Sequence, residues 1–285
     1  MDDRLIEPLA LLRGWAAEQA VTTGQARWLA GGPHAYALAR LIGGDEPAGR
    51  IVPACAIPPE WAAAVGRVVT PAPAAGRAAG PPGRGVINGP PARFSAGGPP
   101  DPVRAALESI QAMHAAGCRI VDIGGESTRP GAPPITAGEE WRRIGPVIRA
   151  VRACTALSDM VLSIDTRQAS VMDQALDAGA DLINDVSALS HDPAARAVVA
   201  RHGCPVVLMH MRGTPATMAA HAVYDDVAVD VLRELSARVE KAVTAGIARE
   251  RILVDPGIGF AKTTKGNLEL LARLPLLANL GCRVV

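Results

Sequence analysis

Polar side chains end a series of short apolar runs in this chain, each at the point where the run meets a loop. These residues are Asn88, Asp122, Asp165, Asn184, Asp185, His210 and Asp255. Taken singly, an Asp or Asn in this position is typical of a helix N-cap or an Asx turn. Gathered at one site, the carboxylates of Asp165, Asp185 and Asp255 would accept hydrogen bonds from the N–H groups of a flat, guanidine-like heterocycle.

A second candidate site is the loop Gly-Gly-Glu-Ser-Thr-Arg-Pro-Gly at residues 124–131. Glycines allow the backbone to approach a ligand, and Arg129 offers a planar fork that suits a carboxylate or a phosphate. The alternative is an exposed loop with a solvated arginine. His210 is more typical of a buried pocket wall than of a ligand, while Lys262 and Lys265 are as typical of solvent as of a site.

Several chemistries find no support in the chain. It has no phosphate-binding loop of the Walker type and no Gly-x-Gly-x-x-Gly before a helix, so no nucleotide cofactor is indicated. Its 5 cysteines are widely spaced and form no Cys-x-x-Cys pair. We therefore expect small buried apolar residues rather than a zinc or redox site.

The elements that must position these residues follow a repeating order of apolar run, polar turn, amphipathic helix and glycine, which is typical of a parallel sheet. The expected strands are Gly85–Asn88, Arg119–Ile123, Val161–Asp165, Leu182–Asp185, Val206–His210, Ile252–Asp255 and Arg283–Val285. The expected helices cover residues 101–117, 169–179, 192–203, 227–246 and 267–281. Asp101-Pro102 and Asp192-Pro193 are start signals, and Gly117 and Gly203 are stop signals.

The spread of polar residues over many strand ends decides between two α/β architectures. A doubly wound sheet collects its ligand groups at one switch point, whereas a (β/α)8 TIM barrel collects them from the carboxyl ends of many strands. We therefore predict an α/β fold of the barrel type. Residues 84–285 accommodate about six βα units and a seventh strand. This prediction is of a barrel that is incomplete at the C-terminus.

A run rich in Pro, Ala and Gly from Thr70 to Pro82 suits neither a helix interior nor a central strand, so we place a domain boundary there. Residues 1–80 are expected to form a helical N-terminal extension, with Ala-rich helical stretches between Leu5 and Leu41. Residues 81–285 are expected to form the barrel domain.

The charge and hydropathy of the chain limit the kinds of partner to expect. The formal net charge of +1 gives no global electrostatic reason to bind nucleic acid or an anionic membrane. The chain lacks an uninterrupted apolar run long enough to span a bilayer, and Met1–Glu7 lacks the order of a signal peptide. We expect a cytoplasmic protein with small-molecule substrates.

Five ordered motifs in the second part of the chain resemble those of the dihydropteroate synthase family. They are DIGGESTRPGA (Asp122–Ala132), SIDTR (Ser163–Arg167), GADLINDVSAL (Gly179–Leu189), MHMRGTP (Met209–Pro215) and DPGIGFAK (Asp255–Lys262). The resemblance implies a pterin-binding TIM barrel of the folate pathway. Such a transferase condenses p-aminobenzoate with 6-hydroxymethyl-7,8-dihydropterin pyrophosphate, with Mg²⁺ on the leaving pyrophosphate, and is often a homodimer.

The resemblance also assigns site residues. Asp165, Asn184 and Asp255 would act in catalysis by holding the pterin ring. Met211 would line the pterin slot, and Gly259 and Phe260 would shape its edge. The p-aminobenzoate side would be formed by Phe94, Thr128, Arg129 and Pro130, and the metal and pyrophosphate would be held at Asn88. The nucleophile would be the substrate's own aromatic amine.

Two features depart from the family pattern. The loop after the first strand reads Asn-Gly-Pro-Pro-Ala-Arg-Phe-Ser-Ala-Gly-Gly and lacks the family's threonine and acidic residues. The chain also ends at Val285, before the family's Ser-Arg-Lys and Arg-x-His motifs. We therefore expect impaired activity from this chain. The alternatives are a non-catalytic pterin-binding protein and a pterin-dependent methyltransferase, although the latter has no need of the Ser-Thr-Arg-Pro-Gly loop.

Overall fold

The computed structural model of the chain describes residues 3–44, 46–73, 84–88, 101–127 and 133–285. These residues group into two compact units. The first combines Met1–Pro73 with Val223–Ser236 and Thr263–Val284, and the second combines Ala74–Ala222 with Ala237–Lys262 and Val285. The domain boundary expected near residue 80 lies outside the described residues and stays a prediction.

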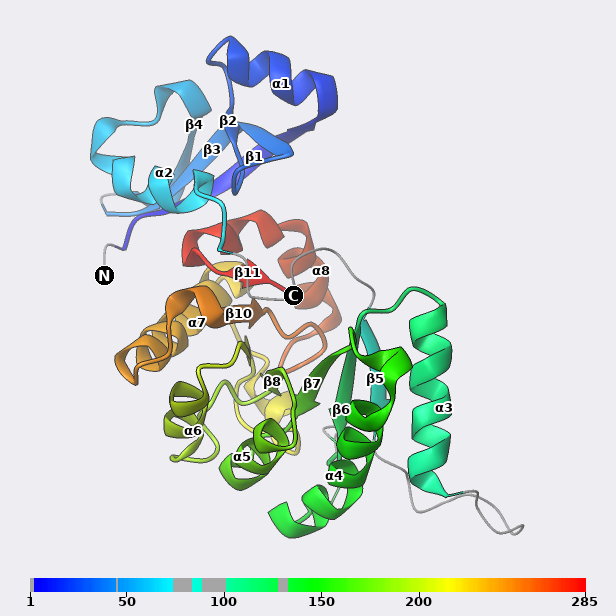
Figure 1. Cartoon of the computed structure of the whole chain (residues 1–285). Helices are drawn as coiled ribbons and strands as arrows, with labels where there is room; N and C mark the ends of the chain where they lie inside the picture. The colour runs from blue at the N-terminus through cyan, green and yellow to red at the C-terminus, as the bar shows by residue number, and fades with distance from the viewer. Residues whose placement is uncertain (1–2, 45, 74–83, 89–100, 128–132) are drawn as a thin grey trace. The chain divides into compact units, whose positions relative to one another are not determined.

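The larger sheet has seven strands that follow one another in chain order (Figure 1). They are β5 (Arg84–Asn88), β6 (Ile120–Gly124), β7 (Val161–Asp165), β8 (Leu182–Asp185), β9 (Val206–Met209), β10 (Ile252–Asp255) and β11 (Arg283–Val284). The pairs from β5 to β10 are parallel. All seven expected strands are confirmed, and their order contains no reversal of the kind that defines a doubly wound sheet.

Helices alternate with the strands along the chain, and those of the second unit cover one face of this sheet (Figure 1). The helices are α3 (Pro102–Ala115), α4 (Ala137–Ala153), α5 (Ala169–Asp177), α6 (Ala195–His202), α7 (Val227–Thr244) and α8 (Thr264–Ala272). Helices α3 to α6 pack side by side in sequence order, as Figure 1 shows. Asp101 caps α3 by accepting a hydrogen bond from the Val103 N–H at 3.0 Å, as its Asp-Pro start signal predicts.

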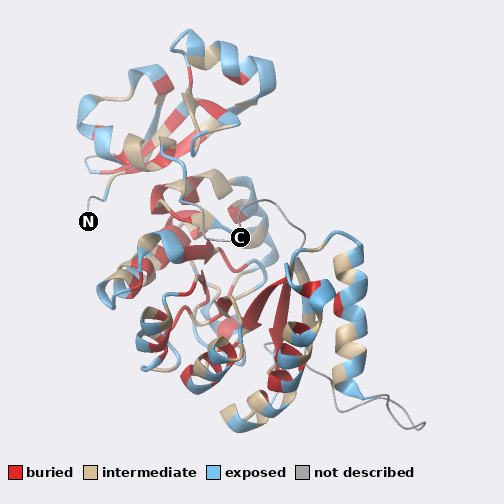
Figure 2. Ribbon diagram, in the orientation of Figure 1, coloured by how far each residue is buried: buried red, intermediate tan, exposed pale blue. Residues whose placement is uncertain are grey.

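The opposite face of the sheet is its inner face. Below the polar strand ends, this face is apolar. Leu182, Val207 and Leu253 from three neighbouring strands pack together there and are buried. Figure 2 shows the same burial along the strands of the sheet. This arrangement is the wall of a βα barrel, with helices outside and packed side chains inside. The described residues thus match an incomplete barrel.

The expectation of a helical N-terminal extension is wrong in part. Residues 3–73 contain α1 (Gly14–Thr22) and α2 (Ala62–Val69), but also an antiparallel sheet of β1 (Leu5–Arg13), β2 (Arg27–Trp28), β3 (His34–Gly43) and β4 (Glu46–Pro53). Pro8 explains the difference for β1, because a proline disrupts a helix interior and is tolerated in an edge strand. Tyr36 and Trp61 belong to a hydrophobic core that includes residues of this sheet and of α2.

The first unit contains a link between the two ends of the chain. Asn279 is buried and pairs with the free edge of β1. Its Nδ2 donates to the Ile6 carbonyl at 2.7 Å, and its Oδ1 accepts from the Ile6 N–H at 3.1 Å. The amide side chain therefore replaces a neighbouring strand at this point of the edge, which leaves neither backbone group of Ile6 without a partner.

The five cysteines are free thiols. Cys204 and Cys282 are buried as expected, and burial raises the pKa of the Cys204 thiol to about 11. Cys55 is exposed, so the expectation of buried cysteines is wrong for this residue.

No helix among the described residues has both the length and the apolar character needed to cross a membrane.

Candidate functional site

The register of the parallel strands brings the polar strand ends to one edge of the sheet. Asn88, Gly124, Asp165 and Asn184 occupy one level across β5, β6, β7 and β8. Asp255 ends β10 and pairs in register with Met209 on β9. The carboxyl ends of a parallel sheet form the ligand-binding edge of a βα barrel. The strand-end residues expected to bind the pterin therefore lie along one edge.

The side chain of Asn184 is held in one orientation by Asp122 on the neighbouring part of the sheet. Its Nδ2 donates to Asp122 Oδ2 at 3.0 Å, while the Ser163 hydroxyl donates to Asp122 Oδ1 at 2.5 Å. Asp122 and Ser163 are buried. Because Nδ2 is the donor in this hydrogen bond, the amide nitrogen of Asn184 faces Asp122. Asp122 is thus a positioning residue, a role that sequence analysis did not distinguish from its neighbours' roles.

Asp165 and Asp255 are only partly buried, in contrast to Asp122 and Asp185. A side chain on Gly124 would place a Cβ 3.3 Å from the Cβ of Asp165, a tight contact. Asp255 Oδ1 accepts the Gly257 N–H at 2.7 Å, which fixes the turn that follows β10. Gly257 must be glycine, because a Cβ there would lie 2.0 Å from the His210 carbonyl oxygen.

Asp185 does not serve as a ligand group. Its Oδ1 accepts hydrogen bonds from the Ser187 N–H and the Ser187 hydroxyl, each at 2.7 Å, and its Oδ2 accepts from the Leu189 N–H at 2.8 Å. Burial raises the pKa of Asp185, although these donors oppose the shift. The suggestion that Asp185 faces the heterocycle is therefore wrong. The residue is an Asx-turn cap, which is the alternative that sequence analysis held open.

An apolar cluster lies next to the acidic edge. It contains Val186, Met209, Met211, Met218 and Ala261, with Phe260 packed against it. The structure thus brings together Met211 and Phe260, two of the expected slot residues. Gly259 has a φ of +85°, a left-handed conformation that favours glycine, although a Cβ there would meet nothing within 4 Å.

Two basic residues that sequence analysis undervalued hold this part of the site in shape. Lys262 donates to the Gly257 carbonyl at 2.8 Å, to the Phe260 carbonyl at 2.9 Å and to His210 Nδ1 at 3.1 Å. Arg238 on α7 donates to the Met209 carbonyl at 2.8 Å and to the Met211 carbonyl at 2.5 Å. Only tertiary structure reveals Arg238, because its partners lie 29 and 27 residues away in the chain.

The loop that leaves β6 begins among charged groups. Arg167 donates two hydrogen bonds to the Glu126 carboxylate, from Nε and from Nη2, each at 2.9 Å. Arg143 on α4 donates to the Gly125 carbonyl at 3.1 Å. The hydrogen bond and charge of Glu126 raise the pKa of Arg167 despite its partial burial. A bidentate pair of this kind fixes geometry as well as charge.

Glu140 on α4 is buried behind this loop, and neither of its carboxylate oxygens has a hydrogen-bond partner of good geometry among the described residues. Burial raises the pKa of Glu140 to about 7, an effect that the nearby Thr166 hydroxyl only partly offsets. Gly125 packs closely here, because a Cβ on it would lie 2.8 Å from Glu140 Cγ.

Several expected site residues lie outside the described residues. They are Phe94, Thr128, Arg129 and Pro130. The backbone of Asn88 ends β5 at the level of Asp165, but its side chain is not described. The roles expected for these five residues stay predictions.

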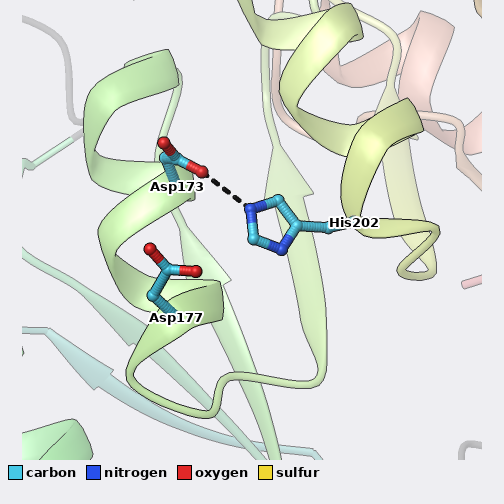
Figure 3. Close-up of side chains that lie close together, drawn as sticks. All are labelled: Asp173, Asp177 and His202. Carbon is cyan, nitrogen blue, oxygen red and sulfur yellow. Dashed lines mark hydrogen bonds and ion pairs between the residues drawn. The ribbon is translucent and has the colours of Figure 1, made fainter.

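The described residues contain one group with the composition of a metal site. Asp173, Asp177 and His202 present ligand atoms within 4.8 Å of one another, as Figure 3 shows on α5 and α6. Asp173 is already paired, with His202 at 2.7 Å and with Arg201 at 2.5 Å, and these hydrogen bonds lower its pKa. The guanidinium of Arg201 repels a metal ion. Asp177 and His202 are the last residues of α5 and α6, and these helix ends lie away from the carboxyl ends of the strands.

The fold and this edge define a class of protein: the chain belongs to the pterin binding enzyme family, whose model matches residues 84–285. It is 44% identical over 176 residues to the dihydropteroate synthase of Synechocystis, covering 62% of this chain and 60% of that protein. It is 41% identical over 185 residues to that of Bacillus subtilis, covering 65% and 61%. The chain thus spans about three fifths of the length of these relatives.

Solved structures agree. The chain is similar to the dihydropteroate synthase of Xanthomonas albilineans with 4-aminobenzoic acid, at 45% identity and a TM-score of 0.64, with 70% of each chain covered. It is also similar to the Xanthomonas enzyme in complex with 7,8-dihydropteroate, at 42% identity and a TM-score of 0.61, again with 70% of each chain covered. These likenesses place the described sheet in the barrel of this enzyme family.

Proposed function

We propose that the protein is a transferase of folate biosynthesis, a dihydropteroate synthase. The reaction joins p-aminobenzoate to 6-hydroxymethyl-7,8-dihydropterin pyrophosphate. The aromatic amine forms a bond to the methylene carbon, the bond from that carbon to the pyrophosphate oxygen breaks, and the amine loses a proton. The products are 7,8-dihydropteroate and pyrophosphate. The observation that carries the proposal is the row of Asp165, Asn184 and Asp255 along the carboxyl edge of the sheet.

The chemistry of this row suits a pterin. A pterin presents a guanidine-like edge of N–H donors, for which carboxylates are the matching acceptors. Asp165 and Asp255 are partly exposed at the edge, and Asn184 is oriented by Asp122 so that its amide oxygen points away from that carboxylate. The apolar cluster around Met211 and Phe260 would contact the flat ring. These residues bind and orient the substrate, and none has to act as a nucleophile.

The remaining roles rest on the resemblance. Thr128, Arg129, Pro130 and Phe94 would contact p-aminobenzoate. Mg²⁺ would neutralise the charge that develops on the departing pyrophosphate. Asn88 would hold it, because an asparagine amide offers an oxygen ligand and the backbone of Asn88 ends β5 at the level of Asp165. We also propose a cytoplasmic location and a homodimer, as the family suggests.

The experiment that tests the proposal measures pterin binding. Titration calorimetry with 6-hydroxymethylpterin should give binding to the wild-type chain that Asp255→Asn weakens by about 1.5–3 kcal/mol, the range for a charge-assisted hydrogen bond. Asp173→Asn is the matched control, because it changes a carboxylate on α5 that lies away from the strand ends. A second assay adds p-aminobenzoate, the pterin pyrophosphate and Mg²⁺ and follows release of pyrophosphate.

The two assays separate the candidate functions. Binding together with pyrophosphate release supports the synthase. Binding without release supports instead the non-catalytic pterin-binding protein. No binding by the wild type, or equal affinity in Asp255→Asn, would remove the acidic row from the pterin site and overturn the proposal.

A further inference from the structure

Gly125 and Glu126, which form the root of the loop after β6, are held by hydrogen bonds to three other residues. Glu126 accepts both hydrogen bonds from Arg167, which follows β7, and its Oε1 also accepts the Ile135 N–H at 3.3 Å. The carbonyl of the preceding residue, Gly125, accepts from Arg143 on α4. Glu126 therefore connects the chain that enters the loop to the chain that leaves it, since Ile135 lies nine residues further on.

The Glu126–Arg167 pair is buried more deeply than an ordinary surface ion pair. The side chain of Glu126 is 9% exposed and that of Arg167 is 16% exposed. Exposed pairs contribute little, because solvent screens them and two long side chains must be ordered. A bidentate pair with little solvent access loses less to screening and fixes both partners in one geometry.

Arg167 is hydrogen-bonded to one acidic side chain, Glu126, and lies within the electrostatic influence of two others. Glu140 and Asp185 also act on the Arg167 guanidinium, but Asp185 is occupied by its turn and Glu140 is buried behind Gly125. Loss of Arg167 would therefore remove a cation that acts on all three carboxyl groups. Loss of Glu126 together with Arg167 would relieve much of the repulsion among these groups.

We propose that Glu126 and Arg167 are positioning residues for p-aminobenzoate: their ion pair fixes the point from which the Ser-Thr-Arg-Pro sequence leaves β6. This inference rests on the proposed function, because that sequence is the one expected to contact p-aminobenzoate. The pair itself touches no substrate. It acts by setting where Ser127 begins, and an error in the placement of a binding group of about 1 Å is enough to cost a large part of its effect.

A second arginine–carboxylate pair in the same unit offers a matched control. Arg152 on α4 pairs with Asp181, and the same Asp181 carboxylate accepts the Leu162 N–H at 2.8 Å. The side chains of this pair are 24% and 31% exposed. It joins α4 to the starts of β7 and β8, so it fastens the opposite end of the strands. Breaking it tests the effect of losing an ion pair without touching the loop root.

The test compares Glu126→Gln, Arg167→Met, the double variant and Arg152→Met. Calorimetry with p-aminobenzoate in the presence of pyrophosphate and Mg²⁺ should show affinity reduced at least tenfold in the first three variants and unchanged within about twofold in Arg152→Met. Affinity for 6-hydroxymethylpterin should stay within about twofold of wild type in all four. Arg167→Lys should give an intermediate loss of p-aminobenzoate affinity, because lysine keeps the positive charge but lacks the planar guanidinium fork.

Hydrogen exchange of the unliganded protein supplies a readout that does not depend on the proposed function. The Ile135 amide should exchange at least tenfold faster in Glu126→Gln than in wild type. The double variant should recover stability relative to Arg167→Met but should not recover p-aminobenzoate affinity. A wild type that binds 6-hydroxymethylpterin but shows p-aminobenzoate affinity unchanged by Glu126→Gln would overturn the inference alone. A wild type that binds neither ligand would overturn the proposed function, and this inference with it.

Discussion

At the scale of single residues, identical side chains at neighbouring strand ends have different tasks because their surroundings differ. Asp165 and Asp255 remain partly exposed at the edge of the sheet, whereas Asp185 is buried and occupied by three donors. Asp122 is also buried, but it orients Asn184. Residue type alone therefore predicts a carboxylate at the site, and the local hydrogen bonds decide which carboxylates can face a ligand.

Glu140 provides a prediction about pH at this scale. The folded protein raises the pKa of this carboxyl from 4.5 to about 7, so the folded state binds more protons than the unfolded state between these values. Stability should therefore fall as pH rises through that window. A difference of about 2.5 pKa units corresponds to about 3 kcal/mol as an upper value. Urea unfolding of wild type and Glu140→Gln at pH 4.5 and pH 8 should show the wild type losing up to that amount relative to the variant.

Glu139→Gln is the matched control for this measurement, because Glu139 neighbours Glu140 on α4 but is only partly buried. The hydrogen bond from Arg143 lowers the pKa of Glu139, so its contribution has the opposite sign. It is present at high pH and lost on acidification. A wild-type protein whose stability relative to Glu140→Gln does not change with pH would show that this carboxyl titrates normally in the fold.

At the scale of elements, one side chain joins several groups of the turn after β10. Lys262 binds two carbonyls of the turn and His210, so it closes the segment between Asp255 and Phe260. Because the ammonium donates to His210 Nδ1, this nitrogen must accept, and the ring proton of a neutral His210 resides on Nε2. The two lysines that sequence analysis treated alike are therefore different, since Lys265 is exposed on α8.

Lys262→Met should loosen this turn while leaving the sheet intact. We expect amide exchange over residues 257–260 to accelerate at least tenfold, because the loss of hydrogen bonds from a charged donor costs about 1.5–3 kcal/mol each. Affinity for 6-hydroxymethylpterin should fall with it. Lys265→Met should change neither quantity. Equal exchange in the two variants would mean that the turn holds its shape without the ammonium group.

At the scale of the whole molecule, a buried ion pair in the first unit joins residues from the two ends of the chain. Arg273 follows α8 and donates to Glu7 on β1 and to Asp226, and the Glu7 contact joins residues 266 positions apart. The side chains of Arg273 and Glu7 are 15% and 3% exposed. Arg40 on β3 also binds Glu7. The N-terminal sheet and the segment after α8 therefore belong to one compact unit.

Arg273→Met should destabilise the protein by about 3 kcal/mol, because removing one partner of a buried ion pair leaves the other charge uncompensated. Denaturant unfolding measures the effect. Arg249→Met is the control, since its pair with Glu240 is about 40% exposed on both sides and should contribute less than about 1 kcal/mol. Equal effects of the two substitutions would show that the link between the chain ends adds nothing to stability.

Local sequence signals determined much of this protein. The alternation of apolar runs and capped helices predicted the seven strands, and the motifs at the strand ends predicted the family, because both depend on neighbours in the chain. Helix α4 escaped this reasoning, since Pro146 lies inside it. The strands β1 and β3 escaped it as well, because their Ala- and Leu-rich sequences suit a helix until they pair with each other.

Only the tertiary structure decided how the site residues are held. The partners of Glu126, Asn184 and Glu7 lie 41, 62 and 266 residues away, distances at which no local pattern relates one residue to another. The same holds for the difference between Asn184 and Asp185, adjacent residues whose side chains point to opposite faces of β8. Sequence determined which chemical groups the chain carries to the edge of the sheet. The packing of strands and helices decided which of those groups are buried in turns, as Asp185 is, and which lie partly exposed at the edge.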